Sequence, residues 1–313
     1  MNKYLLLFLA SSLISFGQVV DTPLFSQTSG FYTNDFDLKL IHVNTDAQII
    51  YTIDGSEPSL DNLSGKTYQY KKQYPEFAGQ LPSDFSFFDN QIITYNYTDL
   101  IFIYDRSTEP NKIANISTTY KYDQYFPNNS VSKSFVVRAK ACINSTCSET
   151  NTQIYFIGNK EYSLPIVNIS VDEDKLFGYE NGLFVAGKLF DEWRIENPSN
   201  ISDFWTPANY LASGSSSEIE VNFIYFERNR LIINQNAGLR INGSSTRSMA
   251  NRSHRLYAKK DYGASEFKHT FFKDHNLNHF KRLILRNSGQ DSYSTMFKDA
   301  FVQTLNKPLK INI

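Results

Sequence analysis

The stretch NAGLRINGSSTRSMANRSHRLYAKK, residues 236–260, decides the expected fold of the second half of this chain. Its two ends have the composition of strands, and the Gly-Ser-Ser segment between them is typical of a turn. Cations are concentrated here, namely Arg240, Arg247, Arg252, Arg255, Lys259 and Lys260. A turn of this kind directs backbone N–H groups into one concavity, and guanidinium groups bind phosphate through two parallel hydrogen bonds. The stretch therefore predicts an anion site.

The candidate anion-binding residues are the turn and the arginines around it: Arg240, Gly243, Ser244, Ser245, Arg247, Arg252 and Arg255. A polar hairpin with a solvated basic face is the alternative interpretation, because runs of charge are commonly solvated. The residue types alone leave both interpretations open.

The segments on either side of this stretch predict further β-structure and one helix. Residues 218–235, EIEVNFIYFERNRLIINQ, predict a β-hairpin that turns at residues 227–230. Further strands are expected at residues 253–259, 265–272 and 282–286. A helix is expected over residues 296–305, because apolar side chains recur there at helical spacing, at Met296, Phe297, Ala300, Phe301 and Leu305.

The first half of the chain predicts a small β-sandwich. Apolar and polar side chains alternate over residues 36–42 and again over residues 49–53, where the strand runs into the turn signal Asp54-Gly55. Aromatic residues make up 15% of the chain and are almost all Tyr and Phe, which favour strands. The predicted fold class is therefore mainly β with some α.

A long insertion rich in Tyr, Asn and Ser occupies residues 62–132. Its apolar segment ITYNYTDLIFIYD, residues 93–105, is expected to form one buried strand. Tyrosine rings stack on sugars through their apolar faces, so the insertion is a candidate glycan platform. Tyrosine is also an ordinary strand residue, and this alternative stays open.

Several acidic and histidine residues are candidates for a metal or sugar site. Asp54 and Glu57 flank a turn, and a turn without a ligand is the simpler interpretation. Residues 171–187 predict a strand, a solvated turn with Asp172 and Asp174, and a second strand, and residues 190–218 predict a mixed linker or lid. The three histidines His269, His275 and His279 would suit zinc only if their segment were helical, whereas the asparagines between them favour a loop.

Residues 1–18 predict a bacterial Sec-type signal peptide, since Lys3 precedes an apolar run and a small-residue exit. The mature protein is then expected to be secreted or at the cell surface, with no membrane span. The two cysteines, Cys142 and Cys147, would pair in such a compartment or remain inert thiols. A net charge of -1 provides no general attraction for nucleic acid or an anionic membrane.

Residues 23–157 carry the segments PLFSQTSGFY, YTIDGSEPS, SFVVRAKAC and IYFIG. These segments resemble the chitobiase C-terminal-like, fibronectin-associated β-sandwich, an immunoglobulin-like module found in exported bacterial proteins. The resemblance implies a structural or spacer unit over residues 19–158. A second domain is then expected over residues 159–313.

Residues 165–313 carry the segments AGLRINGSSTRS, RSHRLYAKKDYG and FKRLILRNSGQDSYSTMFKDAFVQ. Together they resemble the start of the spore-coat CotH kinase family, an atypical protein-kinase-like α+β fold. The resemblance implies that the turn at Gly243 and its neighbouring cations face the phosphates of ATP with Mg²⁺. It also implies phosphorylation of Ser or Thr on a secreted protein substrate.

Two departures from the family pattern limit this expectation. Arg252 stands where the family usually places a lysine, and a planar guanidinium group binds phosphate with a different geometry from a compact ammonium group. The family's acidic catalytic residues lie beyond the first helix, so the chain is expected to be a truncated form with little or no turnover. Asp291 and Asp299 are expected to favour the start of that helix. The alternative is a non-enzymatic surface module that binds a cell-surface polysaccharide.

Overall fold

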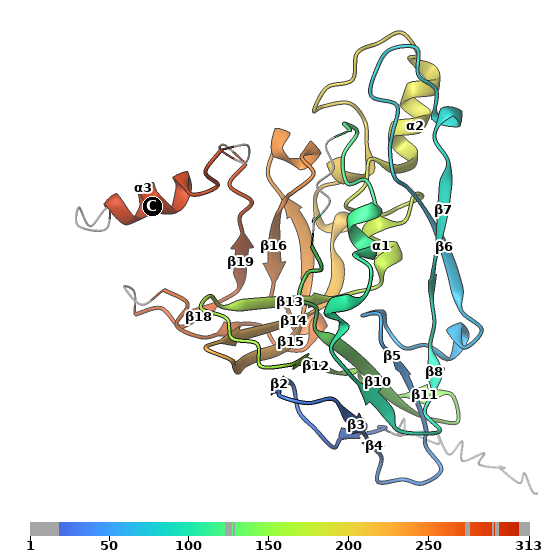
Figure 1. Ribbon diagram of the computed structural model, residues 1–313, viewed down its shortest axis with the longest axis vertical. Coiled ribbons are helices and arrows are strands. Elements are labelled where there is room, and N and C mark those ends of the chain that lie inside the picture. The colour runs from blue at the N-terminus through green and yellow to red at the C-terminus, as the bar shows by residue number, and fades with distance from the viewer. Residues whose placement is uncertain are drawn as a thin grey trace, which may run out of the picture.

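The computed structural model describes residues 19–122, 127, 129–272, 276–289, 291 and 294–306. The expected signal peptide and His275 lie outside this part of the chain. The protein is mainly β with some α, as the composition predicted. Figure 1 shows one sheet at the N-terminal end and a second sheet packed beside it.

The first half forms two β layers around one core. Its larger sheet has the strand order β2 (Gly30–Tyr32), β12 (Asn151–Ile157), β10 (Phe135–Ile143), β5 (Gln48–Thr52) and β8 (Tyr95–Asn96), with β11 (Thr146–Cys147) on β10. Facing it are two pairs, β1 (Leu24–Phe25) with β4 (Leu40–Ile41) and β3 (Phe36–Leu38) with β9 (Ile101–Ile103). Leu38, Ile103 and Val137 are fully buried between the layers.

The single strand expected over residues 93–105 is wrong. This segment forms β8 and β9, which pair with β5 and β3 in different layers. Ile101 and Ile103 enter the core, while Leu100 and Phe102 stay exposed. The chain crosses between the layers at Thr98 and Asp99, two polar residues that break the apolar run.

The second half is built on an antiparallel sheet of five strands. Their order is β13 (Ile166–Ser170), β14 (Ile219–Glu227), β15 (Arg230–Asn242), β16 (Ser253–Tyr257) and β19 (Arg282–Leu285). The predicted hairpin is confirmed, and Arg228 and Asn229 take positive φ at its turn. The predicted helix is also present as α3 (Lys298–Asn306). Only β17 (Phe267–Lys268) forms within residues 265–272, where it pairs with β18 (His279–Phe280).

The second strand expected within residues 171–187 does not form, and two helices occupy the expected turn and the start of the expected lid. They are α1 (Glu173–Phe177) and α2 (Gly187–Glu196). The acids at the start of α1 favour a helix N-terminus, and short apolar runs do not distinguish buried helix from strand. Val185 and Phe190 are fully buried in the same core as the second sheet.

The tyrosine-rich insertion belongs to the core of the second half. Its hairpin of β6 (Lys66–Lys71) and β7 (Phe87–Ile92) runs along the side of the molecule that carries α1 and α2 (Figure 1). Tyr68, Tyr74 and Tyr120 are buried against residues of α2 and the second sheet. These three buried rings are therefore not presented together as a glycan platform.

A second apolar contact joins the two sheets directly. Ile154 and Phe156 of β12 pack against Ile224 and Phe226 of β14. Phe31 stacks on Phe156 with ring centroids 4.7 Å apart, and it meets the edge of Phe226 at 5.6 Å. Both faces of β14 are consequently buried, one against the sandwich and one against the helices.

One ion pair is sealed between the insertion and α2. Lys71 Nζ lies 2.6 Å from Asp191 Oδ2, and the two side chains are 1% and 2% exposed. Nζ also donates to the carbonyl of Pro82 at 3.0 Å and lies 4.7 Å from the centre of the Phe87 ring. Burial raises the pKa of Asp191, and Lys71 opposes that rise. Removal of either partner leaves an uncompensated buried charge.

We predict that Asp191→Asn lowers the free energy of unfolding by about 3–5 kcal/mol, because it leaves the Lys71 ammonium buried without a counter-charge. Urea unfolding followed by tryptophan fluorescence measures the loss. The double variant Lys71→Met/Asp191→Leu is expected to recover much of it. Glu180→Gln is the control, because Glu180 forms an exposed pair with Lys188 at 2.8 Å. Equal losses in Asp191→Asn and Glu180→Gln would contradict the prediction.

Candidate pocket at the glycine turn

The turn after β15 has a backbone shape that requires glycine. Gly243 has φ of 126°, a region that L side chains rarely adopt, and a Cβ there would overlap Thr246 Oγ1. The short 3₁₀ helix η7 (Ser245–Ser248) follows, and β16 starts at Ser253. The turn predicted from the Gly-Ser-Ser segment is therefore present.

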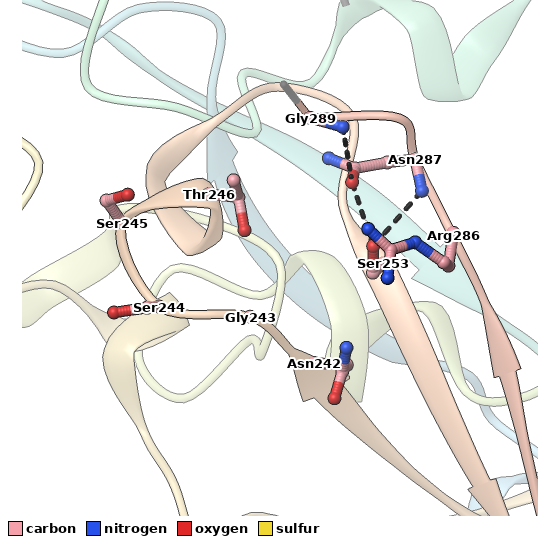
Figure 2. A pocket seen from close by; sticks show the side chains of 9 residues that line it. All are labelled: Asn242, Gly243, Ser244, Ser245, Thr246, Ser253, Arg286, Asn287 and Gly289. Carbon is pink, nitrogen blue, oxygen red and sulfur yellow. Dashed lines mark hydrogen bonds between the residues drawn. The ribbon is translucent and has the colours of Figure 1, made fainter. Parts of the chain in front are cut away.

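A pocket of about 240 Å³ opens beside this turn. Residues 242–246 form one wall, and Ser253 with Arg286, Asn287 and Gly289 forms the other (Figure 2). The second wall follows β19, because its register pairs Leu285 with His254 and brings the next residue beside Ser253. Two segments about forty residues apart in sequence thus meet at one site.

Short hydrogen bonds hold the second wall in place. Ser253 Oγ donates to Asn287 Oδ1 at 2.8 Å, and the backbone N–H of Asn287 donates to Ser253 Oγ at 3.1 Å (Figure 2). The N–H of Gly289 donates to Asn287 Oδ1 at 3.1 Å. A Cβ on Gly289 would lie 2.7 Å from Thr246 Cγ2, so this second glycine lets the two walls approach closely.

Three kinds of hydrogen-bond donor converge on the pocket. Arg286 supplies a guanidinium whose side chain is 56% exposed and lies 2.6 Å from Asp299 Oδ2. Thr246 supplies a hydroxyl that points into the space between the walls (Figure 2). Arg255 donates to Oδ1 of Asn242, which leaves the amide nitrogen of Asn242 turned toward the pocket (Figure 2). This donor set suits an anion.

Arg252 is placed inside the protein rather than in the pocket. Its guanidinium is buried and donates to three carbonyl oxygens, those of Arg247, Phe184 and Thr118. The group also lies 4.6 Å from the centre of the Tyr210 ring. Burial lowers the pKa of Arg252 to about 9. All three bonding partners are structural, so Arg252 joins segments rather than meeting phosphate.

Arg247 binds the backbone of the turn and of a neighbouring segment. Its Nε donates to the carbonyl of Gly243 at 2.8 Å, and its two Nη atoms donate to the carbonyls of Ala212 at 2.7 Å and Ile241 at 3.0 Å. Burial, followed by the positive charge of Arg255, lowers the pKa of Arg247. Arg247 therefore fixes the shape of the turn.

Arg240 is neutralised away from the pocket. It lies 2.7 Å from Oε2 of Glu218, whose side chain is only 4% exposed, and Glu218 also accepts from Lys259 and Tyr262. Hydrogen bonds from these partners outweigh burial and hold the pKa of Glu218 low. The carboxyl group crosses over Gly238, where a Cβ would come within 2.6 Å of it.

Of the seven candidate residues, the structure brings three into the pocket: Gly243, Ser244 and Ser245. Figure 2 shows the hydroxyl of Ser244 directed away from Asn287. The four arginines Arg240, Arg247, Arg252 and Arg255 do not line it. Sequence reasoning missed Arg286 and Asn287, although the LRNSG segment at the end of a predicted strand was a usable signal.

The other acidic candidates are held by local contacts. Asp54 accepts from the N–H of Ser56 at 2.9 Å within its turn, and Glu57 pairs with Arg138 at 2.6 Å and Lys140 at 2.7 Å. Asp172 and Asp174 pair with Lys175 and Lys66. Asp54 thus lies in the expected turn, whereas Asp172 and Asp174 lie at the start of α1 and not in the expected solvated turn.

The zinc candidates and Asp291 also have identifiable partners. His269 lies 3.2 Å from Glu227, and His279 lies 3.0 Å from Glu266. Within the described residues, no three His, Cys, Asp or Glu side chains come together as a metal site. Asp291 Oδ2 accepts from the N–H groups of Phe297 at 3.1 Å and Lys298 at 3.0 Å, so it caps α3.

Comparisons with protein-family models, with curated proteins and with solved structures found no match to this chain.

We predict that Arg252→Lys lowers the free energy of unfolding by about 3 kcal/mol, because one ammonium group cannot replace the planar guanidinium group that donates to three carbonyl oxygens. Chemical denaturation measures the effect. Arg255→Lys is the matched control, since its one hydrogen bond to Asn242 predicts a loss below about 1 kcal/mol. A loss in Arg252→Lys no greater than in the control would contradict the structural role.

Proposed function

We propose that this chain is an exported member of the CotH-type atypical protein kinase family, and that the pocket beside Gly243 binds the phosphates of ATP. The observation that carries the proposal is the meeting of two motif segments. The turn of AGLRINGSSTRS and the end of LILRNSG form opposite walls of one pocket. A donor-lined pocket at this meeting point suits a phosphate chain.

Positive charge behind the turn supports the same proposal. Arg247, Arg252 and Arg255 donate to carbonyl or amide oxygens, which carry no net charge. Their positive charges are therefore not cancelled by these partners. Charge in a partly buried setting is weakly screened and attracts an anion over several ångströms. Arg286 at the rim would make the direct contact.

The pocket fits a phosphate group better than a resident metal ion. Its nine lining residues in the described chain include an arginine and several amides and hydroxyls but no carboxylate. Mg²⁺ prefers carboxylate and phosphate oxygens, so it would arrive with the nucleotide. When bound, it would neutralise part of the phosphate charge.

The acids nearest the pocket are engaged in other contacts. Asp299 pairs with Arg286, and Asp291 caps α3. The hydrogen bond from the Thr295 hydroxyl is the main cause that lowers the pKa of Asp291. Phosphoryl transfer needs a carboxylate that orients the acceptor. We therefore propose nucleotide binding with little or no turnover by this chain, and a Ser or Thr of a secreted protein as the acceptor of the family reaction.

One observation fits an exported protein. Cys142 and Cys147 are joined by a disulfide across the β10–β11 turn, and disulfides persist in oxidising compartments. Among the described residues, no helix has the length and apolar composition needed to cross a bilayer. A non-enzymatic polysaccharide-binding module is less favoured, because four tyrosines of the insertion, Tyr68, Tyr70, Tyr74 and Tyr120, are buried in the core.

We predict that the chain binds MgATP and that Arg286→Ala weakens binding at least about tenfold, because a charge-assisted hydrogen bond is lost. Isothermal titration calorimetry measures both affinities. Arg282→Ala is the matched control, since Arg282 is an exposed arginine of the same strand that does not line the pocket. Asp299→Asn is expected to strengthen binding, because it releases Arg286 from its ion pair.

Two results would overturn this proposal. One is the absence of binding heat at millimolar MgATP with a folded protein. The other is an equal loss of affinity in Arg286→Ala and Arg282→Ala, which would indicate a general charge effect rather than a site.

A further inference from the structure

A second pocket, of about 190 Å³, lies against the same turn. Its walls come from the tyrosine-rich insertion at residues 119–121, from Phe204, and from Ser248 and Met249. Ser245 lines both this pocket and the one beside Gly243, so the two spaces adjoin. Neither the resemblance nor the sequence motifs point to the second space.

The insertion is tied to the turn by three hydrogen bonds. Thr119 Oγ1 donates to the carbonyl of Ser248 at 2.7 Å, and Thr118 Oγ1 donates to the carbonyl of Ala250 at 2.8 Å. Arg252 donates to the carbonyl of Thr118. Thr119 is 2% exposed, so these bonds are shielded from water. The pocket wall is consequently fixed before any ligand arrives.

Phe204 is presented by an ordered loop. The N–H of Asp203 donates to Thr206 Oγ1 at 2.9 Å, and the N–H of Trp205 donates to Asp203 Oδ1 at 2.8 Å. The Phe204 ring lies 5.3 Å from the Trp205 ring and is 45% exposed. An exposed aromatic ring on a fixed loop at a pocket edge is suited to stacking.

The remaining lining groups suit a flat heteroaromatic ring. Met249 and the part of Tyr120 that reaches the pocket form the apolar lining, since Tyr120 is only 5% exposed and its ring also stacks on Phe190. Thioethers make favourable contacts with ring edges. Lys121 holds its ammonium 5.9 Å from the centre of the Tyr120 ring, where it provides a hydrogen-bond donor beside that surface. Ring nitrogens and carbonyl oxygens of a nucleobase accept from such a donor.

We propose that the second pocket binds the base of the nucleotide whose phosphates occupy the pocket beside Gly243. This inference rests on the proposed function. The sugar would cross the shared wall at Ser245, and Phe204 would stack on the base. The nucleotide site is then completed by residues 119–121, which belong to the first half of the sequence.

The test compares the affinity of the full chain for MgATP with its affinity for magnesium tripolyphosphate, which has the phosphates but no base. Calorimetry is expected to give at least about tenfold tighter binding of MgATP, since stacking of one base contributes about 1–3 kcal/mol. Phe204→Ala should remove most of this difference and leave tripolyphosphate binding unchanged. Phe204→Tyr should retain it.

Trp205→Ala is the matched control, because Trp205 is a neighbouring exposed aromatic residue that does not line the pocket. Equal affinity for the two ligands would overturn the base pocket but leave the phosphate site intact. A loss of the difference in Trp205→Ala equal to that in Phe204→Ala would also overturn it. Absence of binding by both ligands would overturn the proposed function and this inference together.

Discussion

The guanidinium of Arg252 is the contact on which the arrangement of the second half depends. It joins the insertion at Thr118, the segment before α2 at Phe184, and the glycine turn at Arg247. A buried cation is unfavourable unless its donors are satisfied, so these three carbonyls are held in one geometry. Both pockets lie beside the turn that is fixed in this way. The ring of Tyr210 packs on the same guanidinium group.

The insertion explains why the two halves of the chain are not independent units. Four of its tyrosines, Tyr68, Tyr70, Tyr74 and Tyr120, belong to the core shared with α2 and the second sheet, and Lys71 neutralises Asp191 beside them. In a second contact between the halves, β14 covers the outer face of β12. A spacer module would need only a small polar boundary with its neighbour. Here the first half contributes buried side chains, and in our proposal also binding residues, to the second.

Local patterns predicted much of the fold because they repeat within a few residues. The β14–β15 hairpin, β16, β19 and α3 follow from alternation or helical spacing. The helices α1 and α2 were missed, since their short apolar runs suit either element once buried. For the site, the glycine turn was predicted, whereas the direction of each arginine was not. Arg286 lines the pocket only because the register of β19 places it beside Ser253.

The sequence by itself determined a β-rich chain with a glycine turn among many cations, because turn chemistry and periodicity act between near neighbours. Only the tertiary structure decided which cation faces the pocket. Arg247 and Arg252 turn inward because carbonyl groups from distant segments offer them hydrogen bonds there, while Arg286 remains at the rim. The tyrosines were likewise assigned to a core by long-range packing, since the same side chains suit a buried core or an exposed surface equally well.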